Sequence, residues 1–348
     1  MNVLSAASGR HGTANACDKA EAEEGCEKGA TGKSCDKRSM ALRQFAFSIT
    51  VATVLGHTVL GFEQAYATPV LAVLAAVATE AVLESVDAAA GRRRPRWLAP
   101  AGRVTDFFLP AYIGGLACAM LLYSGSNISA TVLAAVVGVS SKYLIRIRVR
   151  GAGRHVLNPS NTGIVAVLLL FPWVGIAPPY QFTEWLPGWW AAVPPAVVLV
   201  LGSMLNGKLT GRMPLILGWV GGFVLQALVR GAFTDVSTIS ALLPVTGSAF
   251  VLFTNYMITD PGTTPSRTRN QVVFGLTAAA VYGLLVQVHI VFGFFFALVI
   301  TCALRGAVLV GLDLRRPRRI PQPRVEQTSA RRRLTVDAVD AAGAVEAS

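Results

Sequence analysis

Charged residues are scarce in this chain of 348 residues: Asp, Glu, Lys and Arg make up 14% of it, whereas 53% is hydrophobic. A water-soluble domain cannot bury so large an apolar fraction, so this class is disfavoured. The five cysteines are too few and too scattered for a disulfide framework. The sequence also lacks a Walker loop, a catalytic nucleophile motif and paired metal-ligand patterns, so no metal site is expected. Its composition is that of a membrane protein.

About ten hydrophobic stretches lie between residues 42 and 310, and most approach the roughly 20 residues that cross a bilayer core as a helix. They predict an all-α polytopic membrane protein. The expected spans are 42–61, 66–87, 107–123, 128–145, 161–177, 191–206, 213–230, 242–258, 272–287 and 290–310. The expected domains are a disordered cytoplasmic tail over 1–40, a transmembrane domain over 41–311 and a disordered basic tail over 312–348.

Basic residues gather in alternate connections between these stretches. Arginines crowd 91–103 and 146–154, whereas 124–127 and 178–190 carry none. Because Lys and Arg mark the cytoplasmic side, ten spans place both termini in the cytoplasm of a bacterial inner membrane, with Arg230 as the one exception. The formal charge of +12 therefore indicates orientation signals and anchors for anionic lipid headgroups, with the lipid bilayer and not nucleic acid as the partner.

Two polar, proline-containing segments interrupt the apolar background: HVLNPSNTG at 155–163 and TNYMITDPGTTP at 254–265. Proline removes a backbone donor and disfavours helix before it, while Asn158 and Asp260 offer oxygens to the freed backbone. Two interpretations stay open. Both segments are capped loops at the interface, or they are broken helices at membrane depth, which in transporters bind substrates and ions. In the second case Asn158 and Asp260 shape one site.

The same segments, with SKYLIR at 141–146, carry a family resemblance. They resemble the membrane D subunit of Rnf electron-transport complexes and the B subunit of the sodium-translocating NADH:quinone oxidoreductase, over roughly 42–310. Within that family the chain is most similar to the RnfD-like membrane proteins that accompany enediyne biosynthesis genes in actinobacteria. The resemblance implies a ten-helix bundle of two related halves, similar to urea channels, and flavin-dependent electron transfer coupled to cation movement.

One departure concerns the flavin. Electron-carrying members of the family attach FMN to a threonine of a Ser/Thr-Gly-Ala-Thr motif, expected near 178–190, where this chain has YQFTEW at 180–185. The motif occurs nowhere in the chain, so covalent FMN is not expected, and FMN or riboflavin would be held non-covalently. The candidate cofactor-binding residues are Arg146, Arg148, His155, Asn158, Thr259, Asp260, Thr263 and Thr264.

Ionisable residues inside a membrane span favour a functional interpretation, because a charge in hydrocarbon is costly without a partner or water. Glu80 and Glu84 lie four residues apart on one helix face, and with Asn158 and Asp260 they are the candidate transport residues. Each glutamate either binds a cation or relays a proton, or it pairs with a loop arginine.

Arg146, Arg148 and Arg150 alternate with Ile147 and Val149, which places the three guanidiniums on one side of an extended segment. Such a row suits a phosphate group of a flavin or lipid, or it is an interfacial anchor.

The function expected from these features is transmembrane transport or redox-coupled ion translocation, associated with enediyne natural-product biosynthesis. A flavin-binding electron-transfer subunit and a membrane anchor for biosynthetic enzymes are the alternatives. The partners would then be other membrane or redox subunits, or the biosynthetic enzymes themselves.

Overall fold

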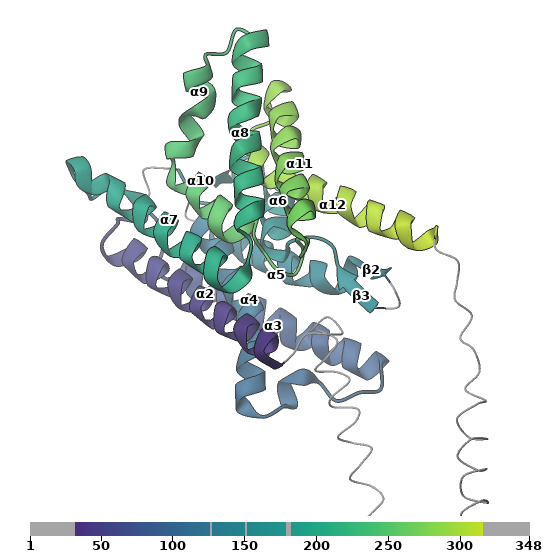
Figure 1. Ribbon diagram of the computed structural model, residues 1–348. Helices are drawn as coiled ribbons and strands as arrows, with labels where there is room; N and C mark the ends of the chain where they lie inside the picture. The colour runs from purple at the N-terminus through teal and green to yellow at the C-terminus, as the bar shows by residue number, and fades with distance from the viewer. Residues whose placement is uncertain (1–31, 126, 150–151, 179–181, 316–348) are drawn as a thin grey trace, which may run out of the picture. The chain divides into compact units, whose positions relative to one another are not determined.

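The hydrophobic stretches of the sequence become helices in the computed structural model, which describes residues 32–125, 127–149, 152–178 and 182–315 (Figure 1). Contacts divide the chain into two units, Met1–Val310 and Gly311–Ser348. Most of both predicted tails lies outside the described residues. The first described helix begins at Gly32, inside the predicted N-terminal tail.

The helices of the described residues follow one another in the order of the hydrophobic stretches. They are α2 (Gly32–Thr58), α3 (Ala67–Ala90), η1 (Arg96–Leu98), α4 (Ala101–Leu121), α5 (Ile128–Leu144), α6 (Pro159–Leu170), η3 (Gly188–Ala192), α7 (Val193–Leu205), η4 (Asn206–Thr210), α8 (Met213–Phe233), α9 (Thr238–Leu242), η5 (Leu243–Thr246), α10 (Ser248–Leu252), η6 (Phe253–Met257), α11 (Thr268–Gln287) and α12 (Gly293–Leu314). Two of these short segments, η4 and η6, are single π-helical turns.

Seven of the described helices are long and apolar enough to cross a membrane, or eight if one bent pair counts as a single span. This supports a polytopic helical membrane protein, but it does not reproduce ten full spans. Helices α5 and α6 have 17 and 12 residues, and at 1.5 Å per residue they reach roughly 26 and 18 Å, short of a bilayer core of about 30 Å. The predicted span 161–177 is wrong in its second half, because Pro172 disfavours helix at Phe171 and α6 ends at Leu170.

The predicted span 242–258 is also not one straight helix. Residues 238–246 and 248–257 form two helical pieces that meet at an angle of 67°. The break falls at Gly247, whose backbone is extended (φ −82°, ψ 141°). The second piece ends in the π-helical turn η6, and the polar segment at 254–265 begins there.

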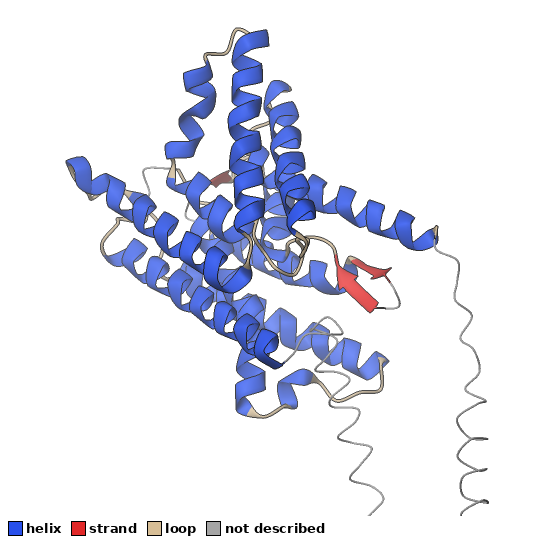
Figure 2. Cartoon of the chain, in the orientation of Figure 1, coloured by secondary structure: helices blue, strands red, loops and turns tan. Residues whose placement is uncertain are grey.

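Two short antiparallel ribbons depart from the predicted all-α fold (Figure 2). Strand β1 (Leu122–Tyr123) pairs with β4 (Gly175–Ile176). Strand β2 (Arg146–Val149) pairs with β3 (Ala152–His155), and Arg146 lies opposite His155. The arginine row is extended in the structure, so Arg146 and Arg148 lie on one face, while Arg150 lies outside the described residues.

Glycines allow two pairs of helices to cross at backbone contact. A Cβ on Gly163 of α6 would overlap the carbonyl oxygen of Ala134 in α5, and a Cβ on Gly275 of α11 would lie 2.5 Å from the carbonyl oxygen of Leu215 in α8. In Figure 1, α8 and α11 run side by side. Small residues at such crossings are typical of membrane helices, which associate through close packing because lipid gives no hydrophobic drive.

Candidate functional site

The two polar segments predicted to form a site are in direct contact. The side-chain amide of Asn158 donates a hydrogen bond of 3.0 Å to the carbonyl oxygen of Met257, in η6. Its amide oxygen accepts from the backbone N–H of Asn161 at 3.1 Å and so caps the start of α6. Asn158 therefore caps α6 and also joins its own segment to Met257 of the other segment, 99 residues further along the chain.

A second asparagine binds the same π-helical turn. The side-chain amide of Asn206, in η4, donates to the carbonyl oxygen of Asn255 at 2.7 Å. Residue 202 must be small for this approach, because a Cβ on Gly202 would lie 2.5 Å from the Cβ of Asn255. Asn206 was not among the predicted site residues. The sequence feature that could have indicated it is a polar asparagine within the otherwise apolar stretch 191–206.

Asp260 follows this turn and organises the loop after it. Its carboxylate accepts from the backbone N–H of Gly262 at 3.2 Å and from the hydroxyl of Thr263 at 2.9 Å, and the hydroxyl of Thr264 donates to its carbonyl oxygen at 2.6 Å. The hydroxyl of Thr259 donates to the carbonyl oxygen of Asn255 at 2.7 Å. Thr259 and Thr264 thus bind the backbone of their own segment, and Thr263 binds the side chain of Asp260.

Two arginines from other parts of the chain donate hydrogen bonds to carbonyl oxygens of this loop. Arg212, which is buried, donates to the carbonyl oxygens of Pro265 and Pro261. Arg305 of α12 donates to the carbonyl oxygen of Thr263 at 2.6 Å. Neither arginine was among the predicted site residues. Arg212 had been interpreted as a topology signal in a basic loop.

His155, at the end of β3, lies beside Asp260. A Cβ built on Gly262 would be 2.8 Å from Nε2 of His155 and 3.4 Å from a carboxylate oxygen of Asp260. A larger residue at 262 would therefore contact both the imidazole of His155 and the carboxylate of Asp260, and glycine leaves room for the two groups to lie close together. His155, Asn158 and Asp260, three of the predicted site residues, are brought together here.

Two buried amide oxygens near this meeting point have no hydrogen-bond partner among the described residues. They belong to Asn161, in the first turn of α6, and to Asn255, in η6. A buried acceptor without a partner costs roughly 1–3 kcal/mol. These two acceptor oxygens suit a cation or a hydrogen-bond donor as ligand.

Glu80 and Glu84 are not part of this site. The carboxylate of Glu80, 2% exposed, accepts from the ammonium of Lys142 at 2.6 and 2.8 Å and from the hydroxyl of Tyr143 at 3.0 Å. Glu84 accepts from Arg93 at 2.5 Å, and this contact raises the pKa of the Arg93 guanidinium. The predicted alternative of pairing with a loop arginine holds for Glu84, whereas the partner of Glu80 is a lysine on α5.

Most of the eight residues proposed for a flavin have partners within the protein. The guanidinium of Arg146 is 3.4 Å from the carboxylate of Asp87 and lies over the ring of Tyr143 at 4.7 Å, while Arg148 is exposed. The threonine hydroxyls are bound to their own backbone or to Asp260. This leaves few groups of the set to bind an isoalloxazine ring or its phosphate.

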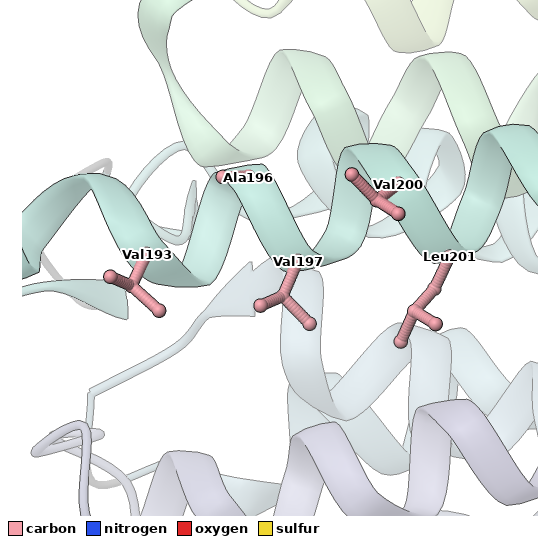
Figure 3. A pocket seen from close by; sticks show the side chains of 5 residues that line it. All are labelled: Val193, Ala196, Val197, Val200 and Leu201. Atoms are coloured by element: carbon pink, nitrogen blue, oxygen red, sulfur yellow. The ribbon is translucent and has the colours of Figure 1, made fainter.

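A hollow of about 320 Å³ lies along α7, but its walls are aliphatic. Figure 3 shows Val193, Val197 and Leu201 projecting from one side of that helix, and Ala196 and Val200 complete the lining. A lining of this kind suits acyl chains and offers no group to orient a polar ligand.

The sequence matches no protein-family model, and no curated protein is significantly similar to it.

Proposed function

We propose that this protein transports a cation, or a polar solute coupled to one, across a membrane. The site would lie where the start of α6 meets η6 and the Asp260 loop. The observation that carries the proposal is the hydrogen bond from Asn158 to the carbonyl oxygen of Met257. It joins the start of the short helix α6 to the end of the bent helix pair 238–257, and interrupted helices within a membrane are the usual place of ion and substrate sites.

The chemistry of the site supports a cation in particular. Asp260 supplies a negative charge, and Asn161 and Asn255 supply buried amide oxygens without a partner among the described residues. Carboxylate and carbonyl oxygens are the ligands that hard cations prefer. The resemblance of the two segments to Rnf-type membrane subunits agrees with cation movement in a bacterial inner membrane, and also suggests a setting beside enediyne biosynthesis.

Asp260→Asn is expected to reduce cation flux at least tenfold, because it removes the charge and nearly preserves the shape. Purified protein in proteoliposomes would be assayed for uptake of Na⁺ and of protons under an imposed membrane potential. The matched control is Asp235→Asn, which neutralises an exposed carboxylate outside the site and should leave flux unchanged. If Asp260→Asn folds normally and keeps the parental flux for both ions, the proposal fails.

The proposed topology has ten membrane-crossing segments with both termini in the cytoplasm. Periplasmic reporters fused near Asn127 and Glu184 should be active, and those near Gly153 and Gly211 inactive, because basic residues surround only the latter pair. Enzyme activity of each fusion in whole cells measures the side. Activity at Gly153 would reverse the arrangement, and activity at all four sites would rule it out.

A further inference from the structure

The half-helix 248–257, the second piece of the bent pair, starts in the middle of the expected span 242–258. Gly247, the residue before it, has an extended backbone and forms no side-chain cap. The first N–H groups of a helix have no partner within that helix. At membrane depth such groups are tolerated only where protein surrounds them or where they line a water-filled cavity. The start of the half-helix therefore requires a polar partner, such as water.

A cavity of about 40 Å³ lies at the start of the half-helix, and α2, α4, α7 and α10 all contribute to its lining. Ser248, which is 6% exposed, is the one polar side chain among the described residues that line it. This volume is sufficient for at least one water molecule, and a buried water needs roughly two to four polar partners. The hydroxyl of Ser248 and the N–H groups of the helix start supply such partners, so the cavity is a place for water.

Helix α7 and the half-helix connect this cavity with the proposed cation site. On α7, Val198 lines the cavity, and Gly202 follows four residues later on the same face. On the half-helix, Leu252 lines the cavity, and Asn255 follows three residues later on the same face. Gly202 and Asn255 meet, because a Cβ on Gly202 would lie 2.9 Å from the amide oxygen of Asn255. Asn255 is 1% exposed, and this oxygen has no partner among the described residues. About one helical turn therefore separates the cavity from an unpartnered buried acceptor.

We propose that the seam between α7 and the half-helix is the outer access route to the cation site. The cavity at Ser248 is its water-filled outer end, and Val198 and Leu252 are the aliphatic side chains that close it. This role rests on the proposed transport function. The positive end of the half-helix disfavours a bare cation beside Ser248, so water in the cavity keeps the cation hydrated until the amide oxygen of Asn255 replaces part of that shell.

The cavity lies on the outer side in the proposed topology. Met120, at the end of α4, and Pro194, at the start of α7, both line it. The connections next to these two residues, 124–127 and 178–190, carry no Lys or Arg, which is typical of external loops. A reagent that cannot cross the membrane should therefore reach the cavity from outside.

Cysteine labelling tests the route without measuring flux. The reagent is trimethylammonioethyl methanethiosulfonate, a membrane-impermeant cation, added outside intact cells. Ser248→Cys, a nearly isosteric change, should react about tenfold faster than Ala249→Cys, because the reactive thiolate forms in water and is disfavoured in apolar surroundings. Ala249 is the matched control, since it follows Ser248 on the same helix and is more exposed, but does not line the cavity. Surface exposure alone predicts the opposite order. Mass spectrometry of the purified full-length protein measures the reaction, with the parent protein as background.

A second change fills the cavity from another helix. Ala52→Leu, on α2, should slow the labelling of Ser248→Cys to the rate of Ala249→Cys. Labelling should also block cation flux in Ser248→Cys and leave it intact in Ala249→Cys. If Ser248→Cys reacts no faster than Ala249→Cys, the route is wrong even where Asp260→Asn abolishes flux. Fast labelling of Ser248→Cys together with parental flux in Asp260→Asn would refute the transport function, and the route with it.

Discussion

Lys142→Ala is expected to destabilise the folded protein by about 3–5 kcal/mol, because it leaves the charge of Glu80 buried without its counter-ion. Glu80 is 2% exposed, and the ammonium of Lys142 contacts both of its carboxylate oxygens. Only the hydroxyl of Tyr143 would remain as a partner among the described residues. Unfolding in mixed micelles with increasing dodecyl sulfate measures the loss.

The double variant Glu80→Gln with Lys142→Met should recover much of that stability, because it removes both charges together. Arg43→Ala is the matched control. Its ion pair with Asp106 spans 2.8 Å but is solvent-exposed, and exposed pairs contribute little. Equal stability of Lys142→Ala and the parent protein would mean that Glu80 is neutral or hydrated, and that the pair does not join α3 to α5.

Gly163→Ala is expected to destabilise the protein by about 3 kcal/mol through a different mechanism, the overpacking of a helix crossing. The new methyl group would overlap the carbonyl oxygen of Ala134, a backbone atom that cannot rotate away. Helices α5 and α6 must then move apart, which also disturbs Asn158 at the start of α6. The same unfolding experiment measures this loss.

Gly114→Ala, in α4, is the control for Gly163→Ala, because it changes helix propensity in the same way without creating a close contact. A Cβ at Gly114 meets no atom within 4 Å, so alanine there should be neutral or stabilising by roughly 0.5–1 kcal/mol. A similar response of the two variants would contradict the close crossing of α5 and α6.

Residue types close together in the sequence determined where most helices form and where several of them end. Apolar stretches predicted the helices, Pro172 explains the end of α6 at Leu170, and Asn158 with Pro159 is a typical helix start, at which the structure places a cap. These features depend on residues a few positions apart, so one sequence suffices to find them.

Partners distant in the sequence were decided by the tertiary structure alone. The pairs Glu80 with Lys142, Asn158 with Met257, and Arg305 with Thr263 are separated by 62, 99 and 42 residues. The same holds for Arg212, which appeared to be a loop charge and is buried against the Asp260 loop. Residue types show that a buried charge or a freed carbonyl needs a partner. Which side chain meets that need depends on how the helices cross and at what depth, and no local pattern encodes this.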